Sequence, residues 1–190
     1  MAESGITLTS KKINRETDEL KLVQAARQDP KAFGELYLLY VEKVFRYLYS
    51  RTGNVLVAED ITAQTFLEAL ESFDRLRQDD RFASWLFTIA RNKAMDHFRQ
   101  RKTASIDDVN EISLNYDPLS GVIQSEQAAA LSKLIQALPE KDRELLRLRF
   151  LADMSFPEIA HFLHRNKEAV KKSIYRLLAR LHSQLEVSNE

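Results

Sequence analysis

Residues 81–102, RFASWLFTIARNKAMDHFRQRK, place cations and hydrogen-bond donors at spacings that suit a chain of phosphates. At 100° per residue, Trp85 and the other large apolar side chains fall on one side of a helix, which predicts that they form core. The other side carries Ser84, Thr88, Arg91, Asn92, Arg99 and Lys102. Such a stripe suits a polyanion. It is equally typical of a solvated helix end whose cations complement the helix dipole, so this segment alone leaves both interpretations open.

A second segment, residues 155–181, predicts two helices joined by a tight turn. Ser155 and Glu158 have the spacing of a capping box, and Asn166 suits the start of the second helix. Apolar residues line one side of that second helix, and its opposite side carries Glu168, Lys171, Lys172, Tyr175 and Arg176. A short helix, a turn and a helix with a basic outer face form the layout that docks in a DNA major groove. A plain helical hairpin with solvated lysines is the alternative.

Glu158, His161 and His164 are the residues nearest to a metal-binding pattern. Helix positions i and i+6 diverge by about 120°, so one of the three would point away from the others. The chain has no Cys, and it contains no Gly-rich phosphate loop, no Ser nucleophile elbow and no H-E-x-x-H. The sequence therefore predicts no enzyme, no metal and no cofactor.

The composition indicates an all-α protein built from two helical blocks. The 190 residues include only four Gly and four Pro, and helical periodicity dominates. We expect a disordered tail over 1–16, a first helical domain over 17–102, an acidic linker over 103–125 and a second helical domain over 126–187. The chain has no apolar run long enough for a membrane and no secretory signal, and its lack of Cys fits a cytoplasmic location. With 28 basic and 28 acidic residues, any polyanion must be met by a local patch.

Three segments in this order resemble a bacterial RNA polymerase sigma factor of the sigma-70 family, in its extracytoplasmic-function (ECF) group. AEDITAQTFLEAL (58–70) resembles the polymerase-binding helix of region 2, and 81–102 resembles the segment that melts the promoter and reads the −10 element. Residues 138–181 resemble region 4, which reads the −35 element. The resemblance implies a transcription initiation factor whose partners are core RNA polymerase, promoter DNA and an anti-sigma factor. A one-component helix-turn-helix regulator that does not bind polymerase is the alternative.

The resemblance also implies a role for individual residues. Polymerase contacts would come from Asp60, Gln64, Phe66 and Leu67. Contacts to the −10 element would come from Arg81, Ser84, Thr88, Arg91, Asn92, Arg99 and Lys102, beside a loop over 74–81 that captures a flipped base. Contacts to the −35 element would come from Arg165, Lys167, Glu168, Lys171, Lys172, Tyr175 and Arg176. The sequence departs from the family at Ala63 and Gln64, where Gln and Glu are usual, and at 164–166, where the turn usually reads G-I-S.

Overall fold

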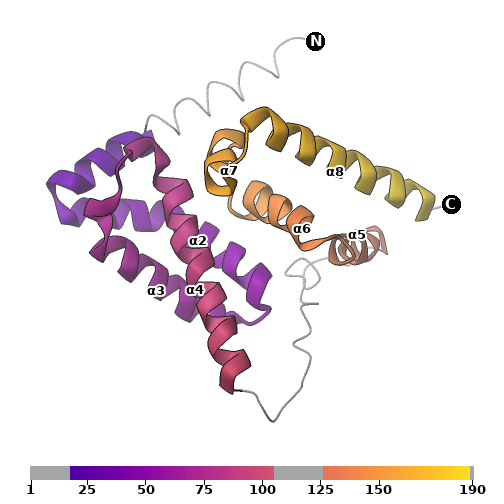
Figure 1. The fold of residues 1–190 in the computed structure, drawn as a ribbon, viewed down its shortest axis with the longest axis horizontal. Helices are drawn as coiled ribbons and strands as arrows, with labels where there is room; N and C mark the ends of the chain where they lie inside the picture. The colour runs from indigo at the N-terminus through magenta and orange to yellow at the C-terminus, as the bar shows by residue number, and fades with distance from the viewer. Residues whose placement is uncertain (1–17, 105–125, 189–190) are drawn as a thin grey trace.

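The computed structural model describes residues 18–104 and 126–188, and every regular element in these ranges is helical (Figure 1). Residues 18–28 form a first helix. The rest of the first half consists of η1 (Pro30–Ala32), α2 (Phe33–Thr52), α3 (Val55–Glu71), η2 (Phe73–Arg75), η3 (Asp79–Arg81) and α4 (Phe82–Ala104). The second half consists of α5 (Glu126–Gln136), α6 (Glu140–Leu146), the π-helical turn η4 (Arg147–Leu151), α7 (Phe156–Leu163) and α8 (Lys167–Ser188). The prediction of an all-α protein with two helical blocks is confirmed. The expected tail over 1–16 and most of the expected linker lie outside the described residues.

Local signals in the sequence fix where the first helices begin and end. Asp29 accepts a hydrogen bond from the Lys31 amide, but Pro30 opens a 3₁₀ turn rather than α2 itself. Gly53 ends α2 with φ 64°, a conformation that glycine adopts without steric cost. The side chain of Asn54 then accepts from the Val57 amide and caps α3. Because one glycine and one asparagine complete this corner, α2 and α3 pack against each other as an antiparallel pair.

Helix α4 packs against α2 and α3 and completes the core of the first half. Phe82, Leu86 and Phe87 are fully buried on its inner side. The lone Trp85 is half-buried and packs against the core near Phe73 and Phe82, as the sequence predicts. Arg27 holds the loop before α4, residues 74–81. It pairs with Asp79 at 2.6 Å and donates to the Leu76 carbonyl. These contacts fix the loop at Leu76 and Asp79 against the helix of residues 18–28, directly before α4 begins.

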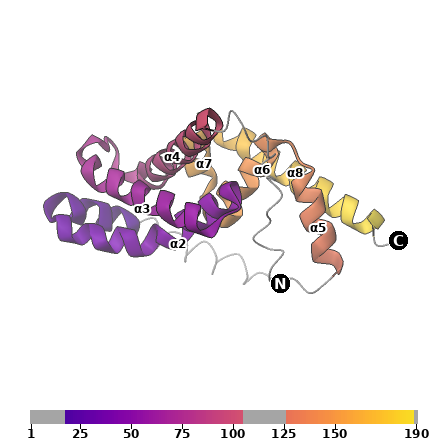
Figure 2. The same cartoon turned by 90° about the horizontal axis from the view of Figure 1, so that it is seen from below.

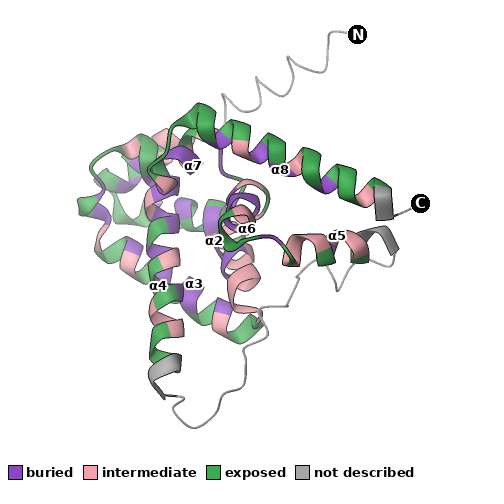
Figure 3. Ribbon diagram, turned by 45° about the vertical axis from the view of Figure 1, so that its right-hand side comes forward, coloured by how far each residue is buried: buried purple, intermediate pink, exposed green. Residues whose placement is uncertain are grey.

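The two halves of the molecule share one apolar core (Figures 1 and 2). Helix α7 lies against α4, and η4 lies against α2. Buried residues of the second half, including Leu148, Met154, Ile159 and Phe162, join the same cluster as Val44 of the first half. Figure 3 shows buried stretches in both halves, on α2 and α4 of the first and on α6 and α7 of the second. A smaller cluster of Leu138, Leu146, Leu177 and Leu181 holds α8 to α5 and α6.

A buried polar group crosses the contact between the halves. The Tyr47 hydroxyl donates to Glu144 Oε1 at 2.7 Å, and Arg51 Nη1 contacts Glu144 Oε2 at 2.6 Å. Burial, followed by the nearby charge of Glu144, raises the pKa of Tyr47 well above its ordinary value. Burial alone would lower the pKa of Arg51, but the charges of Tyr47 and Glu144 outweigh it and raise that pKa. Glu144 accepts from both partners, but Arg51 Nε is buried with no hydrogen-bond partner among the described residues, so the group is only partly satisfied.

Two looser contacts flank this group. Lys43 approaches Asp153 to 3.7 Å, and the Arg91 guanidinium lies 5.3 Å from the centre of the Phe162 ring.

None of the described helices is both long enough and apolar enough to cross a bilayer. No His, Asp and Glu side chains gather into a group of three that could hold a metal ion, within the described ranges.

Candidate nucleic-acid interface

The first three turns of α8 present a continuous polar face to solvent. Val170, Ile174 and Leu177 are buried on the inner side, so the opposite side must face outward. The outward residues are Lys167, Glu168, Lys171, Lys172, Tyr175 and Arg176, and all six are exposed. Their positions follow the spacing of one helix face, as predicted from the sequence. The face carries four cations and one carboxylate, so it is a local basic patch on a chain of zero net charge.

The turn before α8 fixes the angle between α7 and α8. Ser155 and Glu158 form the predicted capping box at the start of α7. His164 ends α7 in the left-handed conformation, with φ 51° and ψ 44°, where the family usually has glycine. Asn166 accepts from the Glu168 amide and starts α8. Arg165 is exposed and donates to the Ser173 hydroxyl at 3.1 Å, which holds it along the surface of α8. The departure at 164–166 therefore keeps the geometry of a tight helix-turn-helix.

The polar stripe on α4 is only partly open to solvent. Arg81, Thr88 and Asn92 are exposed. Ser84 departs from the predicted exposed face: it is buried, and its hydroxyl donates to the Arg81 carbonyl at 3.0 Å. Arg91 is half-buried because Phe162 of α7 covers its guanidinium. The helical wheel could not reveal this cover, since it arises from a segment 71 residues away.

The far end of α4 continues the stripe. Arg99 is exposed and pairs with Asp96 at 3.0 Å, one turn earlier. Lys102 lies in α4, and its side chain is outside the described residues. Met95 lies on the same side and is half exposed. The stripe thus runs from the loop at Arg81 to the end of α4, with its middle covered by α7.

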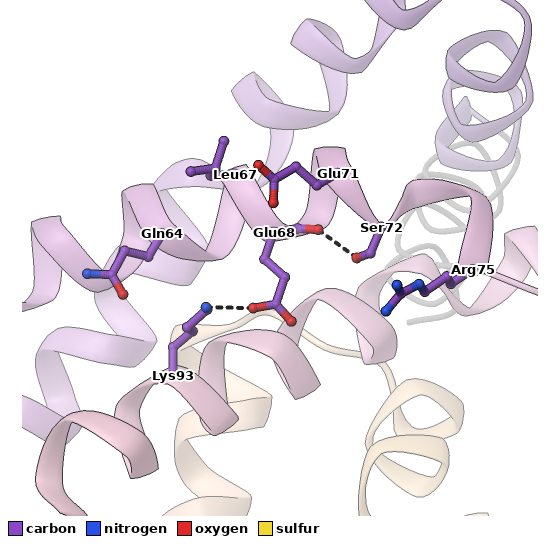
Figure 4. Close-up of a pocket in the computed structure, with 7 residues that line it drawn as sticks. All are labelled: Gln64, Leu67, Glu68, Glu71, Ser72, Arg75 and Lys93. Atoms are coloured by element: carbon purple, nitrogen blue, oxygen red, sulfur yellow. Dashed lines mark hydrogen bonds and ion pairs between the residues drawn. The ribbon is translucent and has the colours of Figure 1, made fainter. Parts of the chain in front are cut away.

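A separate exposed surface lies on α3, and Figure 4 shows part of it. Leu67 is 58% exposed and lines, with Gln64, a hollow of about 310 Å³. Across the hollow, Lys93 of α4 pairs with Glu68 at 2.6 Å. Asp60 is exposed and accepts a hydrogen bond from Gln64 Nε2 at 2.8 Å. The unusual Gln64 therefore has a partner on its own helix one turn away.

Phe66 differs from the other residues predicted on this surface. It is 5% exposed and meets Tyr37 edge to face, with ring centres 4.8 Å apart. Sequence reasoning missed exposed apolar residues nearby: Leu56 is 75% exposed, Leu38 is 68% exposed and Leu70 is 47% exposed. Leu56 and Leu38 gave no sequence signal, because exposure depends on packing that a helical wheel does not include. Leu38 lies on α2, and Leu56 and Leu70 lie on α3; exposed leucines of this kind are candidates for contacts with a partner.

Comparison with known proteins identifies both halves of the chain. A family model described as Sigma-70 region 2 matches residues 36–104, and one described as Sigma-70, region 4 matches residues 128–181. The ECF RNA polymerase sigma factor BldN of Streptomyces coelicolor is 36% identical over 170 residues, which are 85% of this chain and 64% of BldN. The ECF sigma factor SigM of Bacillus subtilis is 30% identical over 159 residues, and the match covers 77% of this chain and 91% of SigM.

A solved structure agrees over nearly the whole chain. CnrH in complex with the cytosolic domain of CnrY matches with a TM-score of 0.61 and 26% identity, and the match covers 89% of this chain and 97% of the other. Three findings agree with one another: the order of the matched regions, the helix-turn-helix of α7 and α8, and the extent of the similarity to SigM. They disfavour a one-component regulator, which would leave region 2 unexplained. The chain belongs to the ECF group of the sigma-70 family of RNA polymerase sigma factors, the initiation factors that direct the polymerase to promoters.

Proposed function

We propose that this chain recruits core RNA polymerase through α3 and reads promoter DNA through α8 and α4. The observation that carries the proposal is the exposed basic face of α8, which follows a tight turn and is backed by buried Val170 and Ile174. A helix presented in this way fits the major groove, where long cationic and polar side chains reach phosphates and base edges. We assign −35 contacts to Arg165, Lys167, Glu168, Lys171, Lys172, Tyr175 and Arg176.

For the polymerase surface we propose Asp60, Gln64 and Leu67, extended by the exposed leucines Leu56 and Leu70. An apolar surface with a few polar groups supports protein binding, because burying each leucine stabilises the complex and the polar groups fix its orientation. Phe66 is buried beneath this surface, where its ring packs against Tyr37. The polymerase acts in the bacterial cytoplasm, so we place the chain there. The reaction belongs to the polymerase, and we assign no catalytic residue to this chain.

For the −10 element we propose Arg81, Ser84, Thr88, Arg91, Asn92, Arg99 and Lys102. The docked arrangement of the two halves is unfavourable for this contact, because Arg91 lies under Phe162. We infer that α7 moves away from α4 before DNA binds there. Buried Ser84 then acts by positioning Arg81, to whose carbonyl it donates. An anti-sigma factor, which the family resemblance implies, would act by covering these same surfaces.

The proposal is tested by reconstituting transcription with purified bacterial core polymerase and a promoter library. The chain should bind the polymerase and select promoters. Lys171→Ala combined with Arg176→Ala should weaken promoter selection and leave polymerase binding unchanged, because both side chains lie on the outer face of α8. Loss of polymerase binding in this double variant would refute the assignment of the faces. Binding to duplex DNA without any binding to polymerase would instead support the one-component regulator.

A further inference from the structure

A cationic cleft of about 650 Å³ lies where the two halves meet. One wall comes from the loop before α4 and the first turns of α4, and it includes Trp85 and Thr88. The other wall comes from α7 and the turn that follows it. The basic side chains that line it are Arg75, Arg77 and Arg81 on the first wall and His161, His164 and Arg165 on the second. No Asp or Glu is among the residues that line this cleft.

Within the described part of the chain, the arginines of the first wall form no ion pairs, although Asp74, Asp79 and Asp80 lie in the same loop. Elsewhere cations are paired: Lys93 with Glu68, and Arg180 with Asp142, for example. The loop carboxylate of Asp79 is already engaged by Arg27 at 2.6 Å. Among residues 18–104 and 126–188, the guanidinium groups of the three cleft arginines on the first wall form no ion pair. Exposed guanidinium groups that form no ion pair can each donate charge-assisted hydrogen bonds to an anion that enters the cleft.

The size and lining of the cleft point to one class of ligand. Arginine side chains bind phosphate oxygens through paired N–H groups, and several arginines on two walls suit several phosphates. The volume is in the range of sites for nucleotide-sized molecules. The half-buried Trp85 also lines the cleft, so its indole can contact a base there. We propose that this cleft binds a small polyphosphate, inorganic or carried by a nucleoside, and that the ligand joins the two halves.

This site goes beyond promoter recognition, because it exists only while the halves are docked. The ligand would contact Arg81 and Thr88, which we assign to −10 DNA, together with Arg165 of the opposite half. An occupied cleft therefore competes with promoter DNA for the same side chains. It also holds α7 against α4 and so stabilises the docked arrangement.

The test uses the intrinsic fluorescence of Trp85, the only tryptophan in the chain. The full chain is titrated with inorganic tripolyphosphate and, separately, with a nucleoside triphosphate at low salt, without DNA or polymerase. The variants are Arg77→Gln and Arg165→Gln, one from each wall, alone and combined. The control combines Lys31→Gln and Lys141→Gln, one from each half, at exposed positions outside the cleft. It removes the same amount of positive charge as the combined cleft variant.

We expect tripolyphosphate to change the fluorescence saturably. Each single cleft variant should weaken binding about tenfold, since each loses charge-assisted hydrogen bonds. The control should change affinity less than about twofold, because exposed charges far from the site are screened. Stronger quenching and tighter binding by the nucleoside triphosphate would show that the base stacks on Trp85. Equal binding of both probes would show that the phosphates alone are recognised.

Three results would overturn the proposal. The first is no saturable binding to the unmodified chain. The second is an equal loss in the cleft and control variants, which would indicate nonspecific charge. The third is a loss with Arg77→Gln and none with Arg165→Gln, which would confine the site to the region 2 loop. Circular dichroism verifies that these exposed substitutions leave the fold intact. Because neither polymerase nor DNA is present, none of these failures bears on the function as a sigma factor.

Discussion

Glu144→Ala should release the second half of the molecule from the first. Glu144 is buried and accepts from Tyr47 and Arg51 across the contact. The Arg51 and Glu144 side chains are 16% and 11% exposed, so this is a buried ion pair. Removing one partner of such a pair costs about 3–5 kcal/mol, because the remaining charge is left unpaired in a dry site. In the undocked molecule Arg51 returns to water, so the cost falls on the docked state alone.

A cost of this size lowers the docking equilibrium constant by a factor on the order of 10² to 10⁴. Within the second half the change is small, since Arg147 keeps its contact with Glu140 at 2.5 Å. Glu140→Ala is the control: it removes an exposed carboxylate whose ion pairs, with Arg143 and Arg147, both lie within the second half, at about 0–1 kcal/mol, while its weaker charge effect on Arg51 is also lost. The control should leave the halves docked.

The separation of the halves can be measured by energy transfer between dyes on two introduced cysteines, because the chain has none of its own. Glu59→Cys and Ser183→Cys place them at exposed sites on opposite halves. Transfer should fall in Glu144→Ala and remain unchanged in the Glu140 control. Replacing all three partners, by Tyr47→Phe, Arg51→Met and Glu144→Leu, should restore docking because no buried polar group of the three is left unpaired. Unchanged transfer in a folded Glu144→Ala protein, or loss of helicity in α6, would refute the reasoning.

Three further outcomes follow from single side chains. Burial raises the pKa values of Tyr40 and Tyr47, so above pH 10 the unfolded chain loses these protons before the folded chain does. The free energy of unfolding should therefore fall by about 1.4 kcal/mol per pH unit for each tyrosine. Tyr47→Phe should halve that slope, measured by urea unfolding. Ser155→Ala breaks the capping box with Glu158 and should lower the free energy of unfolding by about 1 kcal/mol. Calorimetry measures this change, and a loss near zero would show that the cap does not stabilise the fold. Asp60→Ala should weaken polymerase binding in a pull-down while the circular dichroism spectrum is unchanged, because the side chain is exposed; unfolding would contradict this.

Features fixed by short-range chemistry were predictable from the sequence. The capping box at Ser155, the left-handed residue at His164 and the cap at Asn166 depend only on neighbours within a few positions. The outer face of α8 also followed from periodicity, because α8 packs on one side only. Five of its six exposed residues are the ones expected from periodicity, and the sixth, Lys167, was expected from the family resemblance alone.

Burial and contacts that arise between segments far apart in the sequence were not predictable. Tyr47 is fully buried and Glu144 nearly so, yet each lies in a polar-looking stretch, RYLYSR or DRELLR, that suggests solvent exposure. Their burial arises because each half supplies the partner that the other needs. The cover of Arg91 and the cleft beside Trp85 have the same origin. The π-helical turn at 147–151 also left no pattern distinct from an α-helix.

The apolar contact between the halves also has a thermal consequence. Undocking transfers apolar side chains at the contact, Phe162 among them, from a dry interior toward water, as a partial unfolding would. Such a step has a positive heat-capacity change, so its free energy is a curved function of temperature. Burial of apolar surface stabilises less on cooling, and the docked form therefore loses part of its advantage in the cold. The same sequence would then expose its −10 surface more readily at low temperature than at moderate temperature.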